Sequence, residues 1–149
     1  MKLAVLLKST GNKQIVLIRL MVGAVFVCEG IQKVLFPEVL GVGRFAEIGF
    51  PNPEFLGYFV SVFEVICGVL VLLGFLTRLA SIPLIVIMLV AIASTKVPVF
   101  FSEGFWKMAH EARTDWSMLL GALFLLMVGA GSWSLDAYLS RMIDKRRIK

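Results

Sequence analysis

Four long segments of this sequence are apolar almost without interruption, and shorter stretches richer in polar residues separate them. We expect membrane-spanning helices over residues 15–36, 55–76, 79–97 and 116–133. A helix rises about 1.5 Å per residue, so the first segment would reach about 33 Å, enough to cross a hydrocarbon core of roughly 30 Å. The pattern predicts an all-α fold in which residues 1–149 form one integral membrane four-helix bundle.

The segments between the spans also carry apolar residues, which predicts short interfacial helices rather than extended polar loops. Apolar side chains recur within residues 37–53, and phenylalanine and tryptophan alternate with charged residues within 98–115. Helices of this composition lie in the headgroup layer. Residues 135–148 combine an apolar spacing of three and four with basic residues, which predicts an amphipathic tail on the anionic cytoplasmic leaflet.

The charged residues inside the first two spans fall on one face of each helix or at its margin. A charge facing lipid costs roughly 2.5–3.5 kcal/mol, so these residues should face other helices. The second span carries Glu64 as its one charge, on the same face as Gly57, Ser61 and Gly68. The corresponding stripe of the first span, with Glu29 at its margin, is formed by Arg19, Gly23, Phe26, Gly30 and Lys33.

Composition and charge agree with a membrane protein. The chain is 59% hydrophobic with a mean hydropathy of +0.92, above the roughly 45–50% apolar content of soluble domains. Its net charge of +5 does not indicate nucleic-acid binding, because ten of the fifteen basic residues lie near the chain ends or in one turn between spans. By the positive-inside bias, both termini are expected in the cytoplasm. These basic residues are Lys2, Lys8, Lys13, Arg19, Arg78, Arg141, Lys145, Arg146, Arg147 and Lys149.

The rise per residue places Glu29, Lys33, Glu64 and Lys96 in the outer half of the bundle. One interpretation is structural: Glu64 pairs with Lys33 or Lys96 and fixes the register of the helices. The other is functional: a polar pocket opens to the outer face, and its carboxylate exchanges protons with a quinone or a small substrate. Burial and a nearby ammonium move the pKa of a carboxylate in opposite directions, so the sequence leaves both interpretations open.

On the cytoplasmic side, Arg19, Arg78 and Asp136 lie at similar depth. They form either a structural network of snorkelling arginines and a helix-capping aspartate, or a site for an anionic ligand or a partner protein. His110 is the only histidine and has no cysteine near it in the sequence, so we expect no metal site. Cys28 and Cys67 both fall inside spans, where we expect them to pack as small apolar residues.

Several short motifs follow one another along the four predicted spans: Leu17-Ile18-Arg19-Leu20, Gly30-Ile31-Gln32-Lys33, Phe63-Glu64-Val65-Ile66-Cys67-Gly68, Leu73-Gly74-Phe75-Leu76-Thr77-Arg78 and Gly129-Ala130-Gly131-Ser132-Trp133-Ser134-Leu135-Asp136. Through these motifs the chain resembles the DoxX family of small bacterial membrane proteins. The resemblance implies a four-helix bundle in the bacterial inner (plasma) membrane. Many members have a histidine–glycine pair where this chain has Glu29 and Gly30.

Some DoxX relatives are subunits of thiosulfate:quinone oxidoreductase, and others belong to membrane complexes that handle thiol or oxidative stress. The resemblance therefore implies a small subunit of a quinone-linked oxidoreductase complex, with soluble or membrane oxidoreductase subunits as partners and quinone as the candidate cofactor. The chain has no redox-centre motif of its own. The alternatives are a non-catalytic membrane scaffold that recruits partners and, less favoured, a small-solute carrier.

In the leading hypothesis, Glu64 and Glu29 exchange protons. Lys33, Lys96, Arg19 and Arg78 are the candidate cofactor-binding residues. The sequence does not determine the oligomeric state.

Overall fold

A computed structural model describes residues 11–147, and the side chains of the last four of these are left out of the description. Lys2, Lys8 and Lys149, which contributed to the charge argument, lie outside the described residues. The described chain is helical. Its elements are α2 (Ile15–Leu35), α3 (Val42–Ile48), α4 (Pro53–Leu73), α5 (Thr77–Ala91), the π-helical turn η1 (Ile92–Lys96), α6 (Val97–Glu103), α7 (Phe105–Glu111), α8 (Arg113–Val128) and α9 (Leu135–Arg147).

Three helices among the described residues are long and apolar enough to cross a membrane: Ile15–Leu35, Pro53–Leu73 and Thr77–Glu103. They correspond to the first three predicted spans. The third is longer than the predicted 79–97, because η1 and α6 continue α5 without a break. The fourth predicted span, 116–133, corresponds to α8, whose 16 residues extend about 24 Å.

Glycine and proline set the ends of the helices that correspond to the second and fourth predicted spans. Pro53 occupies the first turn of α4, where its missing N–H costs nothing. Gly74 ends that helix three residues before the predicted limit, in the left-handed conformation at φ 66° that glycine adopts readily. Gly129 ends α8 at φ 86°, so residues 129–134 form a loop instead of the last turn of the predicted span.

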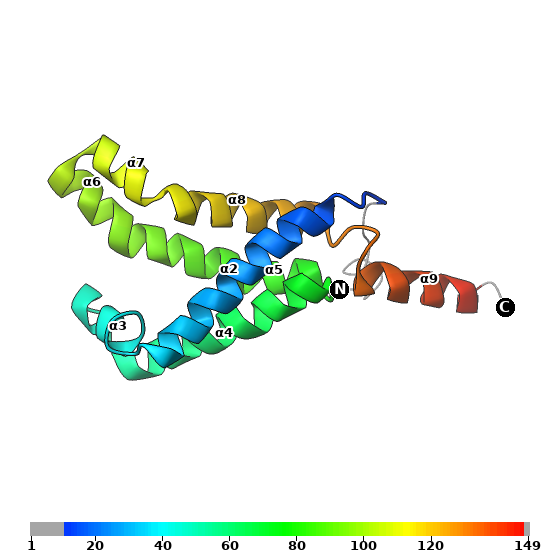
Figure 1. Cartoon of the computed structure of the whole chain (residues 1–149), viewed down its shortest axis with the longest axis horizontal. Helices are drawn as coiled ribbons and strands as arrows, with labels where there is room; N and C mark the ends of the chain where they lie inside the picture. Colours follow the sequence, from blue (N-terminus) through cyan, green and yellow to red (C-terminus); the bar gives the residue numbers. More distant parts are fainter. Residues whose placement is uncertain (1–10, 148–149) are drawn as a thin grey trace.

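The helices form two close pairs, α2 with α4 and α5 with α8, and α4 also packs beside α5. α2 and α8 meet where Gly121 lies against Ile18, Met21 and Val22. Figure 1 shows that the ribbons converge at the end that carries α9 and diverge at the end that carries α3, α6 and α7. We call these the terminal end and the loop end.

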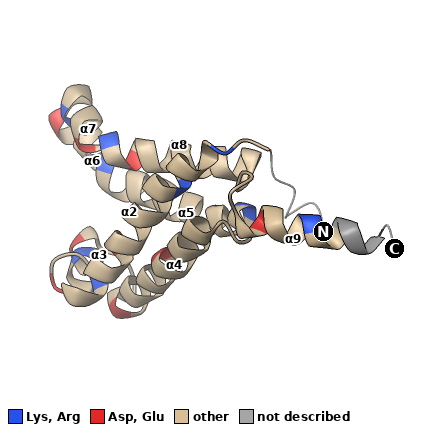
Figure 2. Ribbon diagram, turned by 45° about the vertical axis from the view of Figure 1, so that its right-hand side comes forward, with Lys and Arg blue, Asp and Glu red and all other residues tan. Residues whose placement is uncertain are grey.

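The buried faces of α2 and α4 are those predicted from the sequence. Arg19, Gly23, Phe26 and Gly30 are buried on α2. Gly57, Ser61, Glu64 and Gly68 are buried on α4. The predicted stripe and its partner face are therefore confirmed. Figure 2 shows that the other charged residues gather mainly at the two ends of the bundle.

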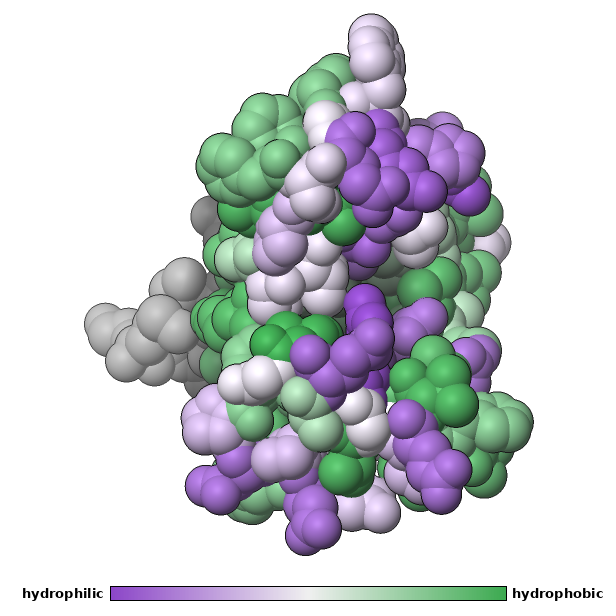
Figure 3. Space-filling model, turned by 90° about the vertical axis from the view of Figure 1, so that its left-hand side faces the viewer, coloured by the Kyte–Doolittle hydropathy of each residue, from purple (hydrophilic) through white to green (hydrophobic). Residues whose placement is uncertain are grey.

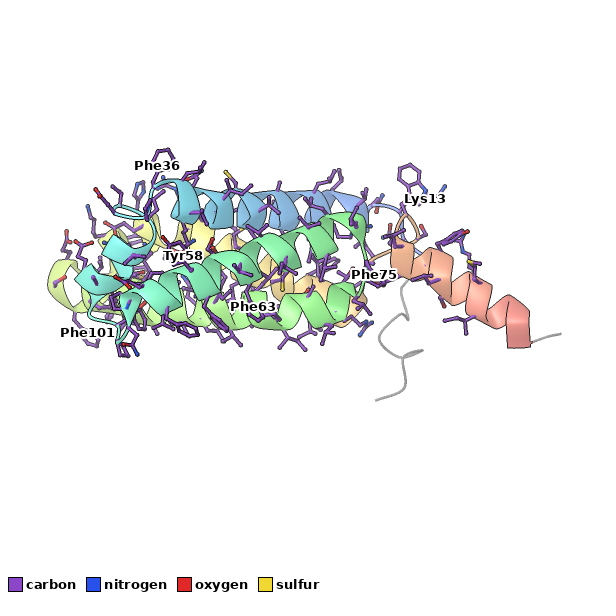
Figure 4. All side chains as sticks on the ribbon, turned by 90° about the horizontal axis from the view of Figure 1, so that it is seen from below. Lys13, Phe36, Tyr58, Phe63, Phe75 and Phe101 are labelled. Atoms are coloured by element: carbon purple, nitrogen blue, oxygen red, sulfur yellow. The ribbon has the colours of Figure 1, made fainter. Side chains whose placement is uncertain are left out.

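Short helices occupy both segments at the loop end, as expected. α3 lies within residues 37–53, and α7 lies within 98–115. The amphipathic tail is also helical, but α9 projects from the terminal end along the long axis of the molecule (Figures 1 and 4). In Figure 4, Phe36 and Phe101 mark the loop end, whereas Lys13 and Phe75 mark the terminal end.

Candidate functional site

The candidate site begins with a close approach of α2 and α4 near the loop end. The Ser61 hydroxyl donates a 2.6 Å hydrogen bond to the carbonyl of Gly30. A Cβ at Gly30 would lie only 2.8 Å from the Ser61 carbonyl oxygen and 3.0 Å from the Glu64 Cβ. The small residues thus let the two backbones approach closely, as in other membrane helix pairs. One turn further along α2, Lys33 lies beside Glu64.

Lys33 bridges two carboxylates. Its Nζ lies 2.7 Å from Glu64 Oε2 and 3.5 Å from Glu29 Oε2. The side chain of Glu64 is 2% exposed, that of Lys33 is 14% exposed, and that of Glu29 is 52% exposed. A buried charge is costly unless it is paired, and here the ammonium supplies the pairing. The three side chains therefore lead from a fully buried acid to an exposed one.

A second ion pair lies on the other pair of helices. Lys96, the last residue of η1, has its Nζ 3.6 Å from Asp115 Oδ2 in the first turn of α8. The sequence allowed Glu64 to pair with either Lys33 or Lys96, and the structure pairs it with Lys33. The predicted ionic set thus divides into two groups. Asp115 was not among the predicted site residues, because its sequence position indicated only a loop above the bundle.

Both ion pairs lie toward the loop end. Figure 3 views this end directly and shows hydrophilic residues around a hollow between two lobes. The lobe that carries α3 is built on α2 and α4, and the other carries α6 and α7. The hollow therefore separates the helix pair of Lys33 and Glu64 from the helix pair of Lys96 and Asp115.

At the terminal end, Arg19 is 3% exposed, and its guanidinium donates to four backbone carbonyls of the described residues. It hydrogen-bonds Val71 O at 2.9 Å and Leu72 O at 2.6 Å, at the end of α4. It also donates to Ala130 O at 3.1 Å and Trp133 O at 2.6 Å, in the loop after α8. A guanidinium suits these positions because the last carbonyls of a helix have no partner within it and carry partial negative charge.

Asp136 caps a helix other than its own. Its carboxylate accepts hydrogen bonds from the backbone N–H groups of Leu76 at 2.7 Å and Thr77 at 3.1 Å, at the start of α5. Ser134 caps α9, accepting a hydrogen bond from the backbone N–H of Ala137 at 3.1 Å. Asp136 is thus a helix-capping aspartate, as expected, but the helix that it caps is α5 and not its own helix α9. The third predicted member, Arg78, has a buried Nε without a hydrogen-bond partner in the described chain.

The remaining candidates stand apart from these two clusters. Cys28 is exposed and accepts a hydrogen bond from Gln32 Nε2 at 3.0 Å, whereas Cys67 is buried; both thiols are free. His110 Nε2 lies 2.6 Å from a guanidinium nitrogen of Arg113. Among the described residues, no group of three or more histidine, cysteine and acidic side chains is arranged to hold a metal ion. The absence of a metal site stays a prediction.

Comparison with known proteins gives one family and two relatives. The family model described as DoxX matches residues 14–97. The chain is 52% identical over 142 residues to the "Uncharacterized membrane protein Rv3486" of Mycobacterium tuberculosis, covering 91% of this chain and 87% of that protein. It is 28% identical over 123 residues to the "Putative oxidoreductase CatD" of Bacillus subtilis, covering 82% and 84%. No solved structure matches the chain.

Proposed function

Because this chain belongs to the DoxX family of membrane proteins, we propose that it is the small membrane subunit of a quinone-linked oxidoreductase complex acting in thiol or sulfur oxidation or in the response to oxidative stress. The observation that carries the proposal is the buried Lys33–Glu64 ion pair inside a membrane-spanning helix pair. Ionisable groups within spans are expensive and commonly serve function. The name of the Bacillus subtilis relative, an oxidoreductase, supports the same class of reaction.

The proposed role of the site is to move a proton between the membrane interior and the loop end. Glu64 is the inner proton-exchanging group, Glu29 is the outer one, and Lys33 contacts both carboxylates. A proton accepted by Glu64 would neutralise its carboxylate and weaken its ion pair with Lys33. The ammonium of Lys33 would then interact mainly with the carboxylate of Glu29. The exposure of the side chains rises from Glu64 through Lys33 to Glu29, which supports proton transfer between the buried carboxylate and the exposed one.

We infer that a quinone headgroup would bind at the loop end, between the two helix pairs. Its carbonyl oxygens need hydrogen-bond donors, and Lys33 and Lys96 place one ammonium on each helix pair. When bound, a quinone would supply a two-electron acceptor that takes up two protons. Lys33 would orient a carbonyl oxygen, and Glu29 and Glu64 would exchange protons with it. Arg19 is less suited to bind a cofactor, because it already donates four hydrogen bonds to carbonyls.

We place the bundle in the bacterial inner membrane with α8 as its fourth span. α8 supports this placement because it packs along the membrane-spanning helix α5. It also begins one residue after α7 ends, with only Ala112 between them. An even number of spans puts both termini on one side, which the basic chain ends make the cytoplasmic side. The hollow at the loop end then faces outward.

The test of the proton role is Glu64→Gln in the purified complex, with quinone-dependent turnover as the measurement. Glutamine keeps the size of the side chain but cannot exchange a proton at this site, so turnover should fall by about 10²-fold or more. Glu54→Gln is the matched control, since Glu54 lies exposed on the same helix. Unchanged turnover in Glu64→Gln would show that the pair is structural.

A second candidate function, a non-catalytic membrane scaffold, is favoured by one observation. α9 packs along no other helix of the described chain and so remains free to contact another protein. A complex that assembles and works normally with Glu64→Gln would favour this scaffold role over the proton role. A carrier role has no comparable support in the geometry.

A further inference from the structure

The helix α9 leaves the bundle. Among residues 135–143, every side chain except that of Asp136 is exposed or half-buried. It does not pack along any of the other helices described. Figures 1 and 4, which view the molecule along perpendicular directions, both show it continuing beyond the terminal end. Its 13 residues extend about 20 Å. A helix of this length is marginal alone in water, so a surface that covers one of its faces would stabilise it.

The base of α9 is fixed to the bundle. The backbone N–H of Asp136 donates to Gly74 O at 2.9 Å, and the Asp136 carboxylate accepts from Leu76 and Thr77. Asp136 is 1% exposed. Ser134 adds a hydrogen bond to Gly131 O at 2.6 Å. These contacts orient the first turn, so tilting α9 onto the membrane surface would break a buried charged cap.

One face of α9 is apolar and uncovered. Leu135, Tyr138 and Met142 are 43%, 61% and 41% exposed, and their spacing of three and four residues places them in one stripe. Ser140 falls on the opposite face of the helix. Apolar stripes of this kind dock amphipathic helices into grooves of partner proteins.

The charge of the segment indicates what kind of groove fits. Residues 135–149 contain two aspartates, of which Asp136 is already engaged in the cap of α5. Arg141 is exposed beside the apolar stripe. A partner with carboxylates around an apolar groove would complement this surface and be steered toward it. The basic residues of the segment are Arg141, Lys145, Arg146, Arg147 and Lys149.

We propose that α9 is a docking helix for a water-soluble protein on the side of the membrane that holds the termini, which binds it through an apolar groove rimmed by carboxylates. The inference rests on the proposed function in that it names the surface where a partner subunit binds. It differs from the expectation of a tail lying on anionic lipid, because the fixed base directs α9 away from the bundle.

The test places a photoreactive amino acid in the full-length protein in native cells, at Tyr138 or Met142, with Ser140 as the matched control position. Illumination should link the two stripe positions to one discrete protein, and Ser140 should give no such product.

The charge of Arg141 is tested in the same cells. Arg141→Glu should remove the product, whereas Arg141→Lys should keep it. The linked protein, once identified and purified, should bind the full-length chain in phosphatidylcholine nanodiscs, about tenfold more weakly with Arg141→Glu.

A parallel arm measures lipid contact. The Tyr138 variant in phosphatidylglycerol nanodiscs without any other protein should form no lipid adduct. Lipid adducts there, equal products at Ser140, or no protein product at either stripe position would each overturn the proposal. These readouts do not involve turnover, so they separate a failure of the docking surface from a failure of the Glu64 proton role.

Discussion

Gly30 illustrates how one small residue supports the whole candidate site. Without a Cβ at this position, Ser61 reaches the Gly30 carbonyl at 2.6 Å, and α2 and α4 come close enough for Lys33 to meet Glu64. Gly68 contributes a second close approach, where a Cβ would lie 2.8 Å from Val27 and 3.0 Å from Gly23 O. The ion pair thus depends on backbone proximity as well as on charge.

Gly30→Ala should destabilise the bundle by about 1–3 kcal/mol, the usual range for overpacking. The new methyl would approach the Ser61 carbonyl, a backbone atom that cannot move aside easily. Equilibrium unfolding in mixed micelles measures the effect. Gly11→Ala is the matched control and should be neutral, because no atom of the described residues lies within 4 Å of a Cβ placed there. Equal stability of the two variants would contradict the close packing described for α2 and α4.

The sequence predicted which residues are buried on these helices but not which base pairs with Glu64. Helical periodicity predicts the face of the helix on which a residue lies, and the rise per residue predicts its depth in the membrane. Glu64 was therefore placed correctly between neighbouring helices. Lys33 and Lys96 were equal candidates by depth. The choice depends on how the helices are rotated and on the π-helical turn before Lys96, which departs from the 3.6-residue period.

Among the helices, α5 depends on a residue from α9. Sequence reasoning identified Asp136 as a helix-capping aspartate near the start of its own helix, which Ser134 caps. Its carboxylate instead satisfies the first N–H groups of α5, 60 and 59 positions away in sequence. Such a contact arises from the tertiary arrangement, and no local pattern reports it. The same holds for the four carbonyls bound by Arg19.

Asp136→Ala should lower the stability of the protein by about 1–2 kcal/mol, the cost of losing a helix cap. Asp136→Asn should cost less, since its amide oxygen still accepts one hydrogen bond. Thermal unfolding of the purified protein compares the two variants. Glu103→Gln, an exposed carboxylate at the loop end, serves as the control. If alanine at position 136 were no worse than the control, the link between α9 and α5 would be absent.

As a whole, the molecule is joined at one end and divided at the other. Arg19 and Asp136 together contact five segments at the terminal end: α2, α4, the start of α5, the loop after α8, and α9. At the loop end, two separate ion pairs lie on two helix pairs. Composition and apolar segment length were sufficient to predict an all-helical membrane protein. They could not reveal that a loop replaces the last turn of the fourth predicted span. Glycine is common within membrane helices, so Gly129 and Gly131 did not mark the end of the helix in the sequence.

The proposed topology predicts which residues a membrane-impermeant maleimide reaches in intact cells. In a background with Cys28→Ser and Cys67→Ala, single cysteines at Glu47 and Glu103 should be labelled, whereas those at Gln14 and Met142 should be labelled only after lysis. The pair Glu103 and Met142 tests whether α8 crosses the membrane. Labelling of both from the same side would show that it does not.

The Lys33–Glu64 contact joins a base and a buried acid from neighbouring helices within the membrane. Solid-state NMR in lipid bilayers tests this directly by measuring dipolar coupling between ¹⁵N-labelled lysine ammonium groups and ¹³C-labelled glutamate carboxylates. Glu64→Gln removes one carboxylate while leaving the Lys107–Glu111 pair of α7, whose charged atoms lie 3.4 Å apart, as an internal reference. We predict that the wild-type protein shows a coupling that this variant loses. Identical couplings in the two proteins would contradict the Lys33–Glu64 contact.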